Sequence, residues 1–160
     1  MSIPKPTIVI IPGAFTSPSA YDTLMTHLHE AGYPATTTPL PSFNSSEPSK
    51  ATCSADAAAI RQRILPLIET EGRELIMLCH SYGGIPGGGA AAGLSTVTRA
   101  RDGLKGGVLG LAYVAGFVVP ENATLLQVMG GKHAPYVVSD NVSLPPHLPS
   151  ASLYGPRKLK

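Results

Sequence analysis

The sequence has few cysteines, few charged side chains and no long apolar segment, and each shortage excludes a class of protein. Cys53 and Cys79 make neither a disulfide framework nor a metal motif, so we expect a reducing, cytoplasmic compartment and no metal or other cofactor. A formal net charge of +2 is too small to indicate a nucleic-acid partner. The longest apolar, uncharged stretch, residues 106–120, is shorter than the ~18 residues that suggest a membrane span. The apolar run at residues 8–11 is too short for a secretion signal.

The length and the apolar content favour a single domain. A chain of 160 residues with 43% hydrophobic and 14% charged residues is long enough for one core and too short for two comfortable ones. From Ser143 onward the composition changes, because prolines and cations gather there without any acidic residue or hydrophobic period. We therefore predict a partial domain over residues 1–142 and an irregular, disordered tail over residues 143–160.

Apolar runs alternate with segments of helical spacing, which predicts an α/β fold with a mostly parallel sheet flanked by helices. The runs that read as buried strands are residues 7–11, 75–79 and 108–119, with a weaker strand at 35–38. The helical segments are residues 21–28, capped by Ser17 or Ser19, and 57–68, capped by Ser54. Residues 39–53 are rich in Pro, Ser and Thr and predict a surface loop.

The most informative motif is CHSYG at residues 79–83, directly after a predicted strand. A serine on a sharp turn between a strand and a helix has its hydroxyl pushed out above the sheet. The main-chain N–H of the next residue, Tyr82, then points to where an oxyanion would form. The helix must fold back tightly against the strand, and Gly83 and Gly84 supply the small residues that this requires. The usual pattern has glycine two residues before the serine, whereas this sequence has Cys79 there.

A second oxyanion donor is expected from a loop after a neighbouring strand. The sequence PGAF at residues 12–15 follows the first predicted strand, as this geometry requires. The main-chain N–H of Ala14 is the candidate donor. The two motifs together favour nucleophilic catalysis by Ser81.

Residues 7 to about 142 resemble the α/β-hydrolase fold superfamily, and look most like a fungal or bacterial branch of small ester hydrolases. The resemblance rests on PGAF at 12–15, HSYGGIPG at 80–87 and AYVAGFVVPE at 112–121. It implies a partial α/β-hydrolase fold, with Ser81 as the nucleophile and with Ala14 and Tyr82 as the oxyanion hole. It also implies a small apolar, ester-like substrate. A cap would begin near residue 121, with residues 125–136 as its first part.

The acid and the histidine of the catalytic triad follow the serine in this fold, and the chain stops before their usual positions. Without an imidazole base, a serine is a weak nucleophile near neutral pH. Asp140 and His147 are in the right order, but too few residues separate them to hold the intervening helix and strand. Glu121, at the same sheet edge as the serine, could pair with His133 from the cap. These two pairs are the possible substitutes.

Three weaker signals carry less weight. The side chain of His80 leaves the turn in another direction from the serine, so we expect it to support the turn. The segment GGGAAA at 87–92 matches a dinucleotide fingerprint only formally, because it begins several residues after its strand. His27 and His29 would lie on different faces of a helix and therefore do not form a chelating pair.

Two classes of function remain open. The first is a serine hydrolase of a small ester, lactone or related carbonyl compound, whose activity is in doubt because the acid and the histidine are missing. The second is a catalytically inactive, truncated remnant that binds a small molecule or a partner. An altered reading frame near Ser143 would be a third explanation of the early stop. The early stop also predicts marginal stability, with Val108, Leu111, Val114 and Phe117 partly exposed; the oligomeric state stays open.

Overall fold

The computed structural model describes residues 4–47, 50–121 and 123–131. These residues belong to two compact units, residues 1–122 and residues 123–160. The second unit contains one short helix among its described residues, α5 (Leu125–Val128), which begins with a capping box between Thr124 and Gln127. The predicted tail at 143–160 and the predicted start of the cap beyond residue 131 lie outside the described residues.

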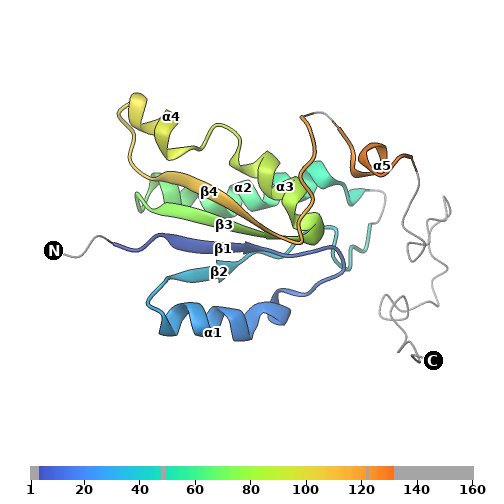
Figure 1. Cartoon of the computed structure of the whole chain (residues 1–160), viewed down its shortest axis with the longest axis horizontal. Helices are drawn as coiled ribbons and strands as arrows, with labels where there is room; N and C mark the ends of the chain where they lie inside the picture. Colours follow the sequence, from blue (N-terminus) through green and yellow to red (C-terminus); the bar gives the residue numbers. More distant parts are fainter. Residues whose placement is uncertain (1–3, 48–49, 122, 132–160) are drawn as a thin grey trace. The chain divides into compact units, whose positions relative to one another are not determined.

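Four parallel strands form one sheet in the first unit (Figure 1). They are β1 (Thr7–Ile11), β2 (Ala35–Thr37), β3 (Glu74–His80) and β4 (Gly107–Val114), in the order β2-β1-β3-β4. The register pairs Ile11 with Cys79 and His80 with Val114. Because the strands are parallel, their carboxyl ends share one edge of the sheet. The prediction of an α/β fold with a parallel sheet is confirmed.

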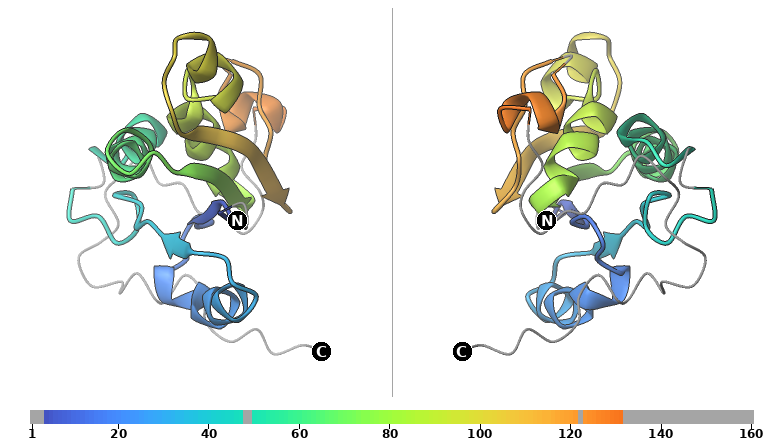
Figure 2. Two further views of the ribbon diagram at one scale, coloured as in Figure 1. Left: turned by 90° about the vertical axis from the view of Figure 1, so that its left-hand side faces the viewer. Right: turned by 90° about the vertical axis from the view of Figure 1, so that its right-hand side faces the viewer.

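Helices cover the two faces of the sheet unequally. The first unit contains η1 (Pro18–Tyr21), α1 (Asp22–Glu30), α2 (Cys53–Glu69), η3 (Ser81–Gly83), α3 (Gly84–Ala91) and α4 (Thr96–Arg101). The helix α1 lies beside β2 on one face, whereas α2 and α3 pack together on the opposite face (Figure 2).

The core lies between the sheet and α2. Alternate residues of β1 and β3 point toward this helix, because successive side chains of a strand point to opposite faces. Those residues are fully buried, and so are the isoleucines that α2 presents at helical spacing. The core residues are Val9, Ile11, Leu75, Met77 and Cys79 from the strands and Ile60, Ile64 and Ile68 from α2.

Helix starts and the long loop differ in detail from the sequence-based predictions. The cap of α2 is Thr52, whose hydroxyl accepts a hydrogen bond from the Ala55 N–H at 3.1 Å, and not Ser54. Ser17 caps η1, and α1 begins after it without a side-chain cap. The loop after β2 is not wholly at the surface, because Leu40 is buried in the core.

The strand β4 ends at Val114, five residues before the predicted end at Val119. The next residue, Ala115, has a φ of 45°, which is the left-handed region and breaks the strand. Beyond it, the Phe117 N–H donates to the Ser81 carbonyl at 3.0 Å instead of to a neighbouring strand. A tertiary contact therefore ends this strand.

The prediction that apolar residues of the 108–119 run are partly exposed is right in part. Leu111 is 36% exposed and Val114 is 49% exposed, and Phe117 is half-buried. Val108 is buried, because its N–H donates to the Leu94 carbonyl and that segment covers it. The exposed part of β4 therefore begins at Leu109, which is 47% exposed, and continues to Val114.

Candidate functional site

Ser81 lies on a sharp turn between β3 and α3. The strand ends at His80, Ser81 opens η3, and α3 begins three residues later. The φ of Ser81 is 51°, in the left-handed region that non-glycine residues rarely adopt. Such a conformation costs ~1–3 kcal/mol and persists only where the surrounding structure holds it. The predicted strand, sharp turn and helix are present in this order.

Glycines let the turn approach two other segments closely. A Cβ atom at Gly83 would collide with the carbonyl oxygens of Pro12 and Ile11, at the end of β1. A Cβ atom at Gly84 would collide with the Phe117 carbonyl oxygen. Both positions therefore require glycine, as predicted from the sequence.

The loop after β1 lies beside the serine. A Cβ atom at Gly13 would be 3.2 Å from Ser81 Cβ and 3.0 Å from His80 Nδ1. This contact follows from the pairing of β1 with β3, which brings both carboxyl ends to one edge. The structure thus places the loop that contains Ala14 next to Ser81 and Tyr82. The roles of Ala14 and Tyr82 as oxyanion donors stay a prediction.

His80 binds away from the serine hydroxyl. Its Nδ1 lies 2.8 Å from Tyr21 Oη, and the two rings meet edge-on with their centroids 5.9 Å apart. The same Tyr21 oxygen accepts a hydrogen bond from the Gly13 N–H at 3.1 Å. His80 therefore connects the turn to the loop beside it, which agrees with the predicted supporting role.

A buried carboxylate, Asp56, hydrogen-bonds the residue that follows Ser81, and the sequence analysis missed it. Asp56 of α2 is fully buried, and its Oδ2 accepts a hydrogen bond from the Tyr82 hydroxyl at 2.8 Å. Ser42, in the loop after β2, donates its N–H to Oδ1 at 2.9 Å and its hydroxyl to Oδ2 at 2.7 Å. An acid four residues before Ile60, on the apolar face of a predicted helix, is the signal that could have identified it.

The buried environment keeps two neighbouring acidic groups protonated. Burial, together with the hydrogen bond to Asp56, raises the pKa of the Tyr82 phenol well above its usual value. Burial also raises the pKa of the Cys79 thiol to about 11. Tyr82 is therefore a hydrogen-bond donor to Asp56 at neutral pH, and Cys79 is an unreactive thiol.

The described histidines all hydrogen-bond groups other than the serine hydroxyl. Besides His80, they are His27, whose Nδ1 lies 3.1 Å from Glu30 Oε2, and His29, which bonds the main chain of Ala35. Within the described ranges, no three His, Cys, Asp or Glu side chains gather as a metal site. Of the acids and bases proposed as substitutes, Glu121 is exposed. Asp140, His133 and His147 lie outside the described residues.

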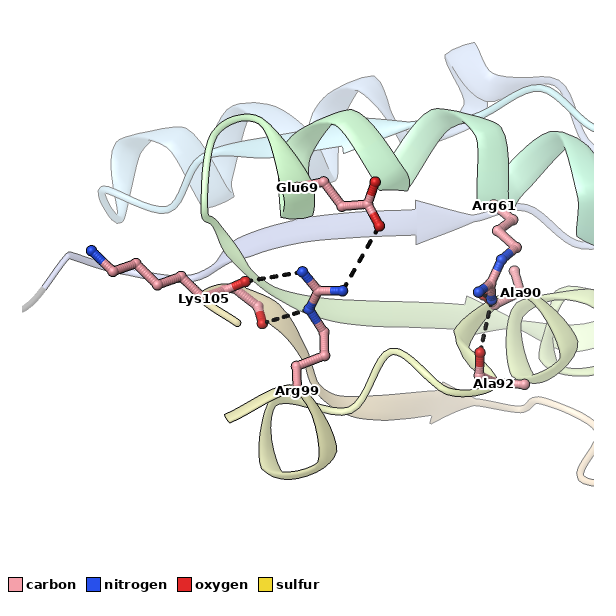
Figure 3. A network of polar contacts seen from close by, with 7 residues as sticks. Arg61, Glu69, Ala90, Ala92, Arg99 and Lys105 are labelled. Carbon is pink, nitrogen blue, oxygen red and sulfur yellow. Dashed lines mark hydrogen bonds and ion pairs between the residues drawn. The ribbon is translucent and has the colours of Figure 1, made fainter. Parts of the chain in front are cut away.

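Two arginines hydrogen-bond main-chain carbonyls that connect elements of the first unit (Figure 3). Arg61 of α2 donates to the carbonyls of Ala90 and Ala92 at 2.9 and 2.8 Å, at the carboxyl end of α3. Arg99 is buried and donates to the main chain of Lys105 and Gly106, with Glu69 at 3.8 Å. Arg61 therefore ties the helix that follows Ser81 to α2.

A hollow of about 920 Å³ opens at the opposite edge of the sheet. It is lined by residues at the amino ends of the strands, such as Thr7 and Glu74. In open parallel α/β sheets, ligands bind at the carboxyl ends of the strands, where Ser81 lies. We therefore assign the candidate site to the Ser81 edge and not to this hollow.

No helix in the described part of the chain is long and apolar enough to cross a membrane.

Comparisons with known proteins agree with this geometry. The chain is 30% identical to a probable hydrolase of Phoma sp. over 128 residues, and 35% identical to an alpha/beta hydrolase of Aspergillus novofumigatus over 121 residues. These alignments cover 80% and 76% of this chain but 49% and 47% of the relatives, so the chain spans about half their length.

A solved structure supports the fold. The crystal structure of a mutant of polyneuridine aldehyde esterase matches with a TM-score of 0.58 and 15% identity, over 79% of this chain and 46% of that one. The sequence of residues 8–157 also matches the family described as the alpha/beta hydrolase family. With the strand order, the serine turn and these matches in agreement, the chain belongs to the alpha/beta hydrolase family.

Proposed function

We propose that this chain carries the nucleophile and the oxyanion hole of a serine hydrolase that acts on a small ester, lactone or related carbonyl compound. The observation that carries the proposal is the left-handed φ of Ser81, 51°, on a strand-to-helix turn beside the loop that contains Ala14. The hydrolase relatives and the esterase fold support the same class of reaction. The free thiols of Cys53 and Cys79 support a cytoplasmic setting.

The proposed reaction transfers an acyl group to the serine and then to water. Ser81 Oγ attacks the carbonyl carbon of the substrate, and the π electrons of the carbonyl move to its oxygen. The N–H groups of Ala14 and Tyr82 stabilise this oxyanion. Its collapse expels the leaving alkoxide and leaves an acyl ester on Ser81, which a water molecule hydrolyses to the acid and the free serine.

Each step also moves a proton. The proton of the Ser81 hydroxyl must pass to a base and then to the leaving oxygen, and the attacking water must lose a proton in the second half. His80 is bonded to Tyr21. His27 hydrogen-bonds Glu30, and His29 hydrogen-bonds the main chain of Ala35. None of these three described histidines hydrogen-bonds Ser81, and on that basis we expect slow acylation and slow deacylation.

Because these three histidines hydrogen-bond groups other than Ser81, the second candidate function is also supported: a binding protein that descends from a hydrolase. An oxyanion hole and a binding site without a working triad retain ~10³–10⁴-fold acceleration over water, far below a complete enzyme. The two candidates differ in whether Ser81 forms a covalent bond to an ester substrate.

The test is site-specific acylation. We would incubate the protein with p-nitrophenyl acetate, map the acetyl group by peptide mass spectrometry and measure p-nitrophenol release in parallel. We expect acetyl-Ser81 to accumulate while turnover stays below ~1 s⁻¹, the low end of enzyme values. Ser81→Ala removes the adduct and changes the total release little, and Glu121→Ala and His133→Ala are nearly silent.

Two other results would change the conclusion. If Ser81 gains no acetyl group, the hydrolase proposal fails and the second candidate, a binding protein, is favoured. Turnover above ~1 s⁻¹ that Ser81→Ala abolishes requires a base in the chain, and the loss of this activity in a His133 or His147 variant would identify it.

A further inference from the structure

Asp56 is a fully buried carboxylate that the proposed acyl transfer does not use. The other acidic residues of the described ranges are exposed. Asp56 lies on the core-facing side of α2, one turn before Ile60, where an aliphatic side chain would be the ordinary choice. Burying a charge without partners costs several kcal/mol, so its presence here requires an explanation in its contacts.

Three hydrogen bonds satisfy this carboxylate. Two of them come from Ser42, through its N–H and its hydroxyl, and the third comes from the Tyr82 hydroxyl. Among the described residues, no buried side-chain nitrogen or oxygen lacks a hydrogen-bond partner. The bonds join α2, the loop after β2 and the turn that follows β3. Hydrogen bonds to a charged, buried acceptor are the stronger ones in proteins, because the low dielectric strengthens them.

The bond to Tyr82 matters because of the position of this residue in the chain. Tyr82 directly follows Ser81, and its main-chain N–H is the proposed oxyanion donor. Its side chain is anchored at the far end by Asp56, while its main chain belongs to a turn that Ser81 holds in a strained conformation. A strained turn keeps one geometry only if several contacts determine it. Asp56 supplies such a contact on the α2 side, as Tyr21 does on the loop side through His80.

We propose that Asp56 is a positioning residue of the hydrolase site: by holding the Tyr82 phenol, it fixes the Tyr82 N–H in the orientation that stabilises an oxyanion at Ser81. The proposal rests on the proposed function, because it gives the N–H a role in acyl transfer. Asp56 itself does not touch the reacting atoms. Its effect is transmitted through one side chain, which makes it separable by substitution.

Two substitutions at the same carboxylate form a matched pair, with Tyr82→Phe as the test and Ser42→Ala as the control. Tyr82→Phe removes only the hydroxyl that reaches Asp56 and keeps the ring and the main-chain N–H. Ser42→Ala removes another hydroxyl donor to the same oxygen, Oδ2, but leaves the bond to the turn. If Asp56 only stabilises the fold, the two variants affect the protein alike. If it positions the turn, only Tyr82→Phe and Asp56→Asn affect the chemistry at Ser81.

The experiment measures the rate constant for acetylation of Ser81 by p-nitrophenyl acetate in the full chain, with urea denaturation of each variant. We expect Asp56→Asn and Tyr82→Phe each to slow the acetylation about tenfold or more, since small displacements of a catalytic group have effects of this size. The double variant should be no slower than the slower single variant, because both changes break one connection. Ser42→Ala should stay within about twofold of the unsubstituted protein. Equal rates in all four variants, whatever their stability, would overturn the proposal.

A second measurement separates this proposal from the proposed function. In ¹⁵N-labelled protein, the amide signals of Tyr82 and Gly83 report the geometry of the turn without any reaction. We expect Asp56→Asn and Tyr82→Phe to shift or broaden both signals, and Ser42→Ala to leave them in place. If Ser81 gains no acetyl group in the unsubstituted protein, the proposed function fails. Unchanged amide signals in Asp56→Asn and Tyr82→Phe would then overturn the positioning role as well.

Discussion

The strain at Ser81 can be measured by replacing the serine with glycine. Glycine adopts the left-handed region at no steric cost, so Ser81→Gly removes the strain that Ser81→Ala keeps. Both variants lack the hydroxyl, and their difference in stability therefore isolates the backbone conformation.

The expected difference follows from two opposing contributions. A non-glycine residue in the left-handed region costs ~1–2 kcal/mol. Glycine loses more conformational freedom on folding, which costs ~0.5–1 kcal/mol. We therefore expect Ser81→Gly to be more stable than Ser81→Ala by about 0.5–1 kcal/mol, or about 1–4 °C in Tm for a domain of this size.

Urea denaturation followed by circular dichroism gives both free energies, and a thermal melt checks the direction. The control is Ala58→Gly, at an exposed position inside α2. There the same exchange of alanine for glycine should lower the stability by about 1 kcal/mol, because the helical conformation suits alanine. If Ser81→Gly is also less stable than Ser81→Ala, the turn is not strained and the argument from its φ fails.

Four further outcomes test the packing around the site. Gly83→Ala should destabilise the protein by about 3 kcal/mol or more in urea, because its Cβ collides with the end of β1, whereas Gly88→Ala, with its nearest contact at 3.7 Å, should stabilise α3 by up to ~1 kcal/mol. Arg61→Met should lower the urea stability by about 1–2 kcal/mol through the loss of two carbonyl contacts at the end of α3; an unchanged midpoint would contradict this. Burial raises the pKa of the Cys79 thiol from 9.0 to about 11. The contribution of the protonated thiol to the free energy of unfolding is therefore complete below pH 9 and is lost by ~1.4 kcal/mol per pH unit as the pH rises toward 11. Cys79→Ala should remove this part of the pH dependence of stability. The exposed apolar residues of β4, from Leu109 to Val114, should bind a hydrophobic dye, and Val114→Lys should weaken the binding; a sharp cooperative melt without dye binding would count against the predicted marginal stability.

The parts of the fold that follow from local pattern were predicted from the sequence. The strands β1 and β3 are apolar on both faces and end at proline, glycine or the serine turn, so their place in a covered parallel sheet can be read directly. The end of β4 could not be predicted from the local sequence pattern. Residues beyond Val114 are as apolar as those before it, and the strand stops because the main chain of Phe117 bonds to Ser81, far away in sequence.

The polar groups around the serine show the same limit. Ser81, Gly83 and Gly84 were predicted because the turn itself needs them. The partners of Asp56 are 14 and 26 residues away, and Tyr21 is 59 residues from His80. No local spacing encodes such pairs. The sequence could signal only that an acid occupies an apolar helix face, and the sheet topology is needed to identify what it binds.

Cys79 departs from the usual motif, and the packing around it explains why the turn tolerates this residue. A Cβ atom at Gly87 of α3 would lie 2.7 Å from Cys79 Sγ, and one at Gly116 would lie 2.9 Å from the Cys79 carbonyl oxygen. Gly87 therefore leaves room for the Cys79 side chain, and Gly116 lets its own segment approach the Cys79 main chain. The close approaches that determine the turn involve Gly83 and Gly84, whose nearest neighbours belong to Ile11, Pro12 and Phe117. The exchange thus changes the packing beneath the serine, while the conformation that exposes its hydroxyl depends on residues that match the motif.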